Sequence, residues 1–112
     1  MSAGLWSLDP DFRPYAQAFI DAVREAGITV QITSTRRSTA LQSKLYEAYK
    51  RGQSPYPAAP PGHSQHNLGL AFDMDVDDRS VLPILGEIWE SLGKGFRWGG
   101  RFRDPVHFDY KT

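Results

Sequence analysis

The sequence contains no cysteine, and this absence excludes several kinds of site. Disulfide bridges, thiolate nucleophiles, iron–sulfur clusters and cysteine-based zinc sites all need a side chain that this chain does not have. A metal ion bound by side chains must therefore be held by His, Asp or Glu. Only three histidines occur, His63, His66 and His107, so the choice of imidazole ligands is narrow.

The chain also lacks an excess of charge of either sign. Thirteen Lys and Arg residues balance thirteen Asp and Glu residues, for a formal net charge of zero. Such a chain has no basic surplus to draw it onto nucleic acid, so no nucleic-acid partner is expected. Long apolar runs are absent too, which predicts no membrane insertion. Residues 1–6 lack the features of a secretory signal, so we expect synthesis in the cytoplasm and another export route.

Three helices are predicted from apolar residues at helical spacing. Two of them cover residues 14–26 and 39–51, and Ser80 is the expected N-cap of the third. The expected buried stripes are Phe12, Ala16, Phe19, Ile20 and Val23 in the first, Leu41, Leu45, Ala48 and Tyr49 in the second, and Val81, Ile84, Leu85, Ile88 and Leu92 in the third.

Alternating apolar and polar residues predict strands between these helices. They cover residues 28–33 and 68–76, and a closing pair covers 96–98 and 106–110. Four prolines between residues 52 and 62 predict an extended loop. The expected fold class is α+β, in a single domain over residues 1–112.

Two histidines and an aspartate could form a metal site. A catalytic zinc site typically takes three protein ligands and leaves a fourth position for water. Asp73 alternates with the apolar Phe72, and His107 with the apolar Phe108, so both polar side chains leave the core face and His66 approaches from the preceding loop. Residue spacing alone supports equally well a surface histidine and a solvated aspartate.

Three motifs occur in order along the chain. They are Thr33-Ser34-Thr35-Arg36-Arg37-Ser38 followed by Gln42 and Leu45, then Ser64-x-His66-x-x-Gly69-x-Ala71-x-Asp73, then Asp104-x-x-His107-Phe108. Together they resemble the signature of the zinc D-alanyl-D-alanine carboxypeptidase and L-alanyl-D-glutamate endopeptidase family, small cell-wall peptidases of bacteria and of phage lysis enzymes. The resemblance covers residues 28–110.

The resemblance implies a role for each matching residue. His66, Asp73 and His107 would bind Zn²⁺, and Asp104 would be the general base. A carboxylate beside zinc-activated water suits that role, since it can take the proton and return it to the departing amine. Arg37 would stabilise the oxyanion that develops as water attacks the carbonyl.

Three further positions are less sharply defined. Arg36 adjoins Arg37, and the alignment of the flanking serines favours Arg37. Gln42 is a candidate substrate contact, but Thr39-x-x-Gln42 also matches a helix capping box. Ser64 either contacts substrate or orders its loop.

The function that this resemblance implies is hydrolysis of a peptide bond in peptidoglycan stem peptides. The implied fold is an antiparallel sheet packed by helices, with the zinc site in a cleft on the sheet. Small size and the aspartate at position 104 favour the L-alanyl-D-glutamate endopeptidase over the D-alanyl-D-alanine carboxypeptidase. A non-catalytic zinc-containing cell-wall-binding domain is the alternative from another class. We expect a monomer that acts on the cell wall, with phage or prophage lysis as one route of access.

Overall fold

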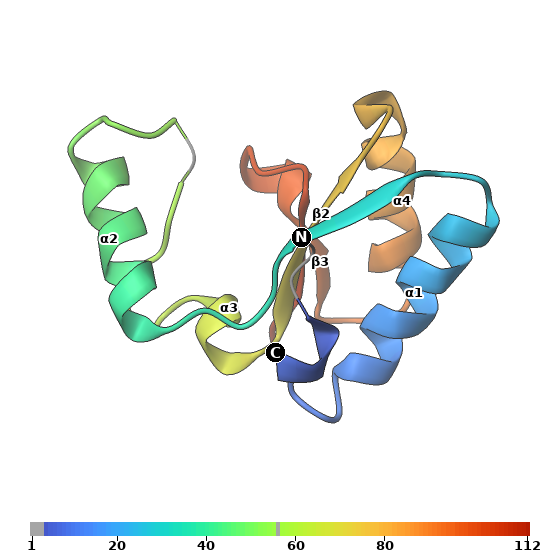
Figure 1. The fold of residues 1–112 in the computed structure, drawn as a ribbon, viewed down its shortest axis with the longest axis horizontal. Helices are drawn as coiled ribbons and strands as arrows, with labels where there is room; N and C mark the ends of the chain where they lie inside the picture. The colour runs from blue at the N-terminus through green and yellow to red at the C-terminus, as the bar shows by residue number, and fades with distance from the viewer. Residues whose placement is uncertain (1–3, 56) are drawn as a thin grey trace.

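The computed structural model describes residues 4–55 and 57–112, and it contains one antiparallel sheet with helices on both sides (Figure 1). The four strands lie in the order β1-β2-β4-β3. Their bounds are β1 (Val30–Ser34), β2 (Ala71–Val76), β3 (Phe96–Trp98) and β4 (His107–Tyr110). The helices are α1 (Arg13–Glu25), α2 (Thr39–Lys50), α3 (Gln65–Leu68) and α4 (Leu82–Glu90), with short 3₁₀ turns at η1 (Leu5–Ser7), η2 (Arg79–Val81) and η3 (Gly99–Phe102). The α+β class predicted from the sequence is confirmed.

Helices α1 and α4 lie together on one side of the sheet, and the core lies between them and the strands (Figure 1). Aromatic rings fill its centre. Phe72 of β2 stacks on Phe108 of β4 with ring centroids 5.4 Å apart. Trp89 of α4 meets Phe72 edge-on, also at 5.4 Å. Phe19 of α1 also contacts Trp89, with centroids 5.1 Å apart. Because such pairs contribute about 0.5–1.5 kcal/mol each beyond their buried area, this cluster ties the two central strands to both helices.

The stripe predicted for α1 is confirmed, whereas the stripe predicted for α4 is only partly right. In α4, Leu85 is buried, but Ile84 and Ile88 are exposed. The helix instead buries Leu82 and Trp89, which lie outside the predicted stripe. When apolar residues lie on most sides of a helix, helical spacing fits more than one buried face. Contacts with the rest of the protein then determine which face is buried.

Helix α2 lies apart from the core, on the other side of the sheet (Figure 1). The prediction that Leu41, Leu45 and Tyr49 form a buried stripe is wrong, since these side chains are 46%, 37% and 37% exposed. The residue that α2 buries is Gln42. These apolar side chains are therefore not packed into the core, and Leu45 lines a cavity instead.

The expected strand over residues 68–76 begins later, at Ala71. Residues 65–68 form the short helix α3 instead, and Gly69 ends it with a φ of 75°. A side chain at Gly69 would also meet the Asp9 backbone nitrogen at 2.8 Å, so the position requires glycine. Ser80 is not the N-cap of α4. It lies within η2, the turn that precedes α4, and the N-cap of η2 is Asp78.

No helix in the described part of the chain has both the length and the apolar character needed to cross a membrane. Of the N-terminal segment considered above, residues 1–3 lie outside the described residues.

Candidate metal centre and its cleft

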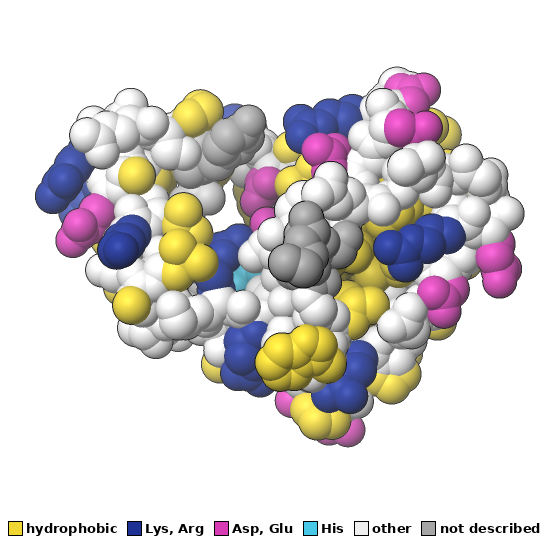
Figure 2. Space-filling model, viewed as in Figure 1, with side chains coloured by type: hydrophobic (Ala, Val, Ile, Leu, Met, Phe, Trp, Pro, Cys, Tyr) yellow, Lys and Arg dark blue, Asp and Glu magenta, His cyan; other side chains and the backbone are white. Residues whose placement is uncertain are grey.

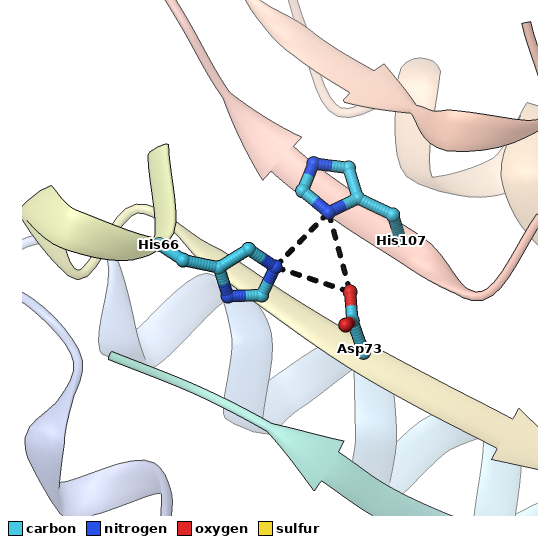
Figure 3. A group of neighbouring side chains, drawn as sticks. All are labelled: His66, Asp73 and His107. Carbon is cyan, nitrogen blue, oxygen red and sulfur yellow. Dashed lines mark hydrogen bonds and ion pairs between the residues drawn. The ribbon is translucent and has the colours of Figure 1, made fainter. Parts of the chain in front are cut away.

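His66, Asp73 and His107 meet at one point on the sheet face opposite the core (Figure 3). The Nε2 atom of His66 lies 3.1 Å from Asp73 Oδ1 and 3.1 Å from His107 Nδ1. The third side of this triangle, from His107 Nδ1 to Asp73 Oδ1, is 3.2 Å. The structure thus brings together the three residues that the sequence proposed as ligands.

Strand register places two of these side chains side by side. Asp73 of β2 and His107 of β4 are directly paired across the antiparallel ladder. Paired residues project from the same face, and here that face is opposite Phe72 and Phe108, which are a pair of the core face. The alternation read from the sequence is therefore confirmed.

His66 comes from α3 rather than from a loop, and two contacts orient it. Ser64 is the N-cap of α3, and its Oγ accepts the backbone N–H of His66 at 3.2 Å. The Nδ1 atom of the buried His66 ring lies 2.6 Å from the Thr35 carbonyl oxygen. A carbonyl can only accept, so Nδ1 carries the proton and the lone pair of Nε2 faces Asp73 and His107.

His107 is oriented in the same way by a carboxylate. Its Nε2 atom lies 2.7 Å from Asp109 Oδ2, and Asp109 in turn receives two hydrogen bonds from Arg97, at 2.8 and 2.6 Å. With Nε2 protonated, Nδ1 is free to bind a metal ion. Neither Asp109 nor Arg97 was predicted from the sequence as a functional residue. The signal was the spacing of His107 and Asp109, since residues two apart in a strand share a face.

The donor set fits a catalytic zinc ion. Two imidazole nitrogens and one carboxylate oxygen converge, and each ring has a hydrogen-bond acceptor beside the nitrogen that faces away from the centre. Three protein ligands of these types are those of catalytic zinc sites, which keep the fourth position for water.

Charges at this centre are strongly coupled. Burial by itself would lower the pKa of His107, but hydrogen bonds to Asp109 and Asp73 outweigh it and raise the pKa to about 9. Burial would raise the pKa of Asp73, yet the hydrogen bonds from His107 and His66 hold it well below its usual range. In the metal-free protein, a proton on His107 therefore supplies the positive charge that a metal ion would bring.

Asp104 lies at the edge of the same centre. Its Oδ2 atom is 4.0 Å from His107 Nδ1, and its carbonyl accepts the backbone N–H of His107 at 3.0 Å. Burial, together with the negative charge of Asp73, raises the pKa of the Asp104 carboxyl. A carboxyl group with a raised pKa is better suited to take up a proton near neutral pH.

Arg37 lies against the centre, and Arg36 does not. Nη2 of Arg37 is 3.2 Å from Asp73 Oδ2, whereas the Arg36 guanidinium donates to the backbone oxygens of Ser7, Asn67 and Leu68. Burial lowers the pKa of Arg37, although the charges of Asp73 and Asp104 act in the opposite direction. Of the two arginines, the structure therefore places Arg37 beside the candidate centre and Arg36 against the backbone of neighbouring segments.

Gln42 supports Arg37 from α2. Its Oε1 atom accepts a hydrogen bond from Arg37 at 3.1 Å, and its amide donates to the Ala59 carbonyl at 2.8 Å. The alternative capping-box reading of Gln42 is wrong, because the N-cap of α2 is Ser38, whose Oγ accepts the Leu41 N–H.

A cleft runs past the centre between α2 with its following loop and the sheet. Figure 2 shows this hollow, with a histidine and side chains of both charges visible within it. It consists of two adjoining cavities of about 280 and 340 Å³, which share Arg37, Pro57, Ala58 and Asp104. One extends towards Leu45 and Arg79, and the other towards Gln65 and Lys111. The candidate centre is therefore open on two sides.

Comparison with known proteins gives one family match. The family model described as VanY, D-alanyl-D-alanine carboxypeptidase, matches residues 6–99. The match includes His66 and Asp73 and ends before Asp104 and His107, which the fold itself places at the centre. No curated protein matches this chain.

Solved structures also resemble the chain. VanYB in complex with D-alanine-D-alanine is 26% identical with a TM-score of 0.68, over 92% of this chain and 71% of that one. A mutant of the D,D-pentapeptidase VanY from a VanB-type resistance cassette, in complex with Zn(II), is 25% identical with a TM-score of 0.67, over 92% and 72%. The L-Ala D-Glu endopeptidase ChiX of Serratia marcescens has the same fold, at 19% identity and a TM-score of 0.64, over 96% and 83%.

Proposed function

This chain belongs to the VanY family of D-alanyl-D-alanine carboxypeptidases and is a peptidoglycan peptidase of that type, and we propose that it holds its zinc ion with His66, Asp73 and His107. The observation that carries this proposal is the convergence of three ligand atoms within 3.1–3.2 Å of one another, with an acidic and a basic side chain beside them. The relative crystallised with Zn(II) supports the choice of metal.

The reaction is hydrolysis of a peptide bond in a stem peptide. Zinc, when bound, supplies a Lewis acid that polarises the scissile carbonyl and lowers the pKa of water to about 7. The oxygen of the water molecule attacks the carbonyl carbon, and Asp104 takes the proton that the water loses. It then delivers that proton to the amine nitrogen as the carbon–nitrogen bond breaks. Arg37 places a fixed positive charge where the carbonyl oxygen becomes negative.

For the bond that is cleaved, our first candidate lies between L-alanine and D-glutamate. An endopeptidase must hold peptide on both sides of the scissile bond, and the cleft extends from the centre in two directions. The aspartate at position 104 favours the same activity on the sequence resemblance.

A second candidate is the terminal D-alanyl-D-alanine bond. It is favoured by the description of the family to which the chain belongs and by the relative crystallised with D-alanine-D-alanine. The two activities release different products. The endopeptidase frees the amino group of D-glutamate, whereas the carboxypeptidase frees D-alanine.

Digestion of purified peptidoglycan by the zinc-loaded protein, followed by mass spectrometry, tests both the activity and the bond. We expect new amino groups on D-glutamate. Asp104→Asn should lower the rate by about 10²–10⁴-fold, because the general base is lost, while zinc measured by elemental analysis stays at wild-type content. Asp21→Asn, which alters an exposed aspartate of α1, is the matched control and should leave the rate unchanged.

Three other outcomes would each remove part of the proposal. Release of D-alanine alone would replace the first bond with the second. Equal amine release by wild type and Asp104→Asn would remove the catalytic role of Asp104. Binding to peptidoglycan without any hydrolysis would leave the non-catalytic wall-binding domain as the function.

A further inference from the structure

The chain turns sharply at Arg103, the residue that precedes Asp104. Arg103 ends η3 in the left-handed conformation, with a φ of 65° and a ψ of 29°. Among the residues that the structure describes, it is the only one other than glycine with a positive φ. This conformation is uncommon for a residue with a side chain, because Cβ comes too close to the following carbonyl oxygen. The fold therefore holds an unfavourable backbone conformation directly beside the proposed general base.

Neighbouring residues explain why the turn falls at position 103. Pro105 disfavours the helical conformation for the residue before it, so η3 does not continue through Asp104. The backbone N–H groups of Arg103 and Asp104 both donate to the Gly99 carbonyl, the second at 2.8 Å, and these bonds close the turn. A side chain at Gly99 would collide with the Asp104 carbonyl and with Cβ of His107, so the turn packs directly against β4. The change of chain direction is thus confined to Arg103.

The residues on both sides of Arg103 contact the ligand His107. The Phe102 ring meets the His107 ring edge-on, with centroids 5.6 Å apart. The Asp104 Oδ2 atom lies 4.0 Å from His107 Nδ1, and the Asp104 carbonyl accepts the His107 backbone N–H at 3.0 Å. Phe102 and Asp104 also line the same cavity of the cleft. A different φ at residue 103 would rotate these two residues relative to each other, so they could not both keep their contacts with His107.

The side chain of Arg103 is not what places it at the centre. It is exposed, and Arg103 lines neither cavity of the cleft. The contribution of position 103 to the site is therefore its backbone conformation.

We propose that Arg103 is a positioning residue, whose left-handed backbone holds the Asp104 carboxylate beside the candidate metal centre. The inference rests on the proposed function, because it takes Asp104 as the general base. Unfavourable backbone conformations persist where surrounding contacts hold them, and they cluster at active sites. A displacement of a reacting group by about 1 Å can lower a rate roughly 10²-fold. A modest change of the backbone at Arg103 is therefore enough to affect catalysis.

A pair of substitutions at position 103 separates the backbone from the side chain. A β-branched residue strongly resists a positive φ, whereas glycine adopts it freely. We expect Arg103→Val to lower kcat on peptidoglycan about tenfold or more, with KM within about twofold of wild type and an unchanged zinc content. Arg103→Gly should keep kcat within about twofold, although it removes the whole side chain. Arg51→Val is the control, because Arg51 is also an exposed arginine that ends a helix, but its φ is −83°.

Crystal structures of the two variants give a readout that does not depend on activity. The distance from Asp104 Oδ2 to His107 Nδ1 should stay near 4.0 Å in metal-free Arg103→Gly, and it should change by about 1 Å or more in Arg103→Val. If valine prevents folding, Arg103→Ala replaces it, with a smaller expected change in the same direction.

Two sets of outcomes separate this proposal from the proposed function. Wild-type kcat or an unchanged distance in Arg103→Val overturns the positioning role and leaves the peptidase proposal intact. An equal loss of kcat in Arg103→Gly and Arg103→Val, or a loss of zinc from Arg103→Val, overturns it as well. A wild-type protein that hydrolyses no stem peptide removes the proposed function, and the distances in the two variants then decide whether Arg103 positions Asp104.

Discussion

Asp109 holds the ring of His107 from the side that faces away from the candidate metal centre. It is almost fully buried, and its carboxylate lies between His107 Nε2 and the Arg97 guanidinium. Burial would raise the pKa of Asp109, but hydrogen bonds from His107 and Arg97 lower it, so it remains a charged acceptor. A carboxylate on the distal nitrogen of a ligating histidine sets the tautomer and increases the basicity of the ring.

Asp109→Asn should therefore weaken zinc binding by about 10–100-fold, as measured by competition with a chelator of known affinity. Asp75→Asn is the control, because Asp75 lies on the same strand face as Asp73 but pairs with the exposed Arg79. We expect its zinc affinity to match wild type. If Asp109→Asn binds zinc as tightly as Asp75→Asn, Asp109 does not act through His107.

At the scale of the elements, α2 and its following loop form one wall of the cleft. The apolar side chains of α2 are exposed, so few buried contacts hold this wall against the sheet. Gln42 is the exception. It is 1% exposed and connects α2 to Arg37 and to the Ala59 carbonyl of the loop. Its two hydrogen bonds join the wall of the cleft to the residue beside the candidate centre.

Gln42→Ala should lower the free energy of unfolding by about 1–3 kcal/mol, because it leaves buried polar partners unsatisfied. It should also speed proteolysis in the loop over residues 52–62 and reduce kcat/KM, since Arg37 loses a contact that orients it. Chemical denaturation and limited proteolysis measure the first two effects. Gln53→Ala, at an exposed position in that loop, should change stability by less than about 0.5 kcal/mol. Equal stability of the two variants would contradict this account of Gln42.

At the scale of the whole molecule, the metal-free protein is expected to depend on a proton at the centre. The pKa of His107 is raised to about 9 from the ordinary 6.5. A raised pKa in the folded state gives a stability contribution that is fully present below pH 6.5 and is lost as the pH rises through 9. The shift corresponds to a contribution on the order of 3 kcal/mol. Asp73, whose pKa is lowered, is ionised throughout this window and contributes no change within it.

The Tm of the metal-free protein should therefore fall between pH 6.5 and 9. Zinc should restore it, and the gain from zinc should be larger at pH 9, because the metal no longer competes with a proton on His107. A saturating ligand at about a thousand times its dissociation constant stabilises by roughly 4 kcal/mol. Differential scanning fluorimetry with and without chelator at the two pH values measures both effects. A metal-free Tm that rises with pH would show that His107 is not the protonated group.

Local patterns predicted α1, the positions of the strands and the opposite orientations of the core and polar side chains on β2 and β4. These features follow from periodicities of two and 3.6 residues, which depend on neighbours in the chain. The patterns failed for α2 and for part of α4. An apolar stripe shows which face of a helix is apolar, but the partner that covers it comes from distant residues.

The sequence by itself determined which residue types could hold a metal, because it has no cysteine and only three histidines. Its motifs also selected His66, Asp73, His107, Asp104 and Arg37. Only the tertiary structure decided that Asp73 and His107 pair across two strands, that Asp109 and Thr35 orient the two rings, and that a cleft passes the centre. Strand register and cavities arise from contacts between segments far apart in the chain, and spacing within one segment cannot specify them.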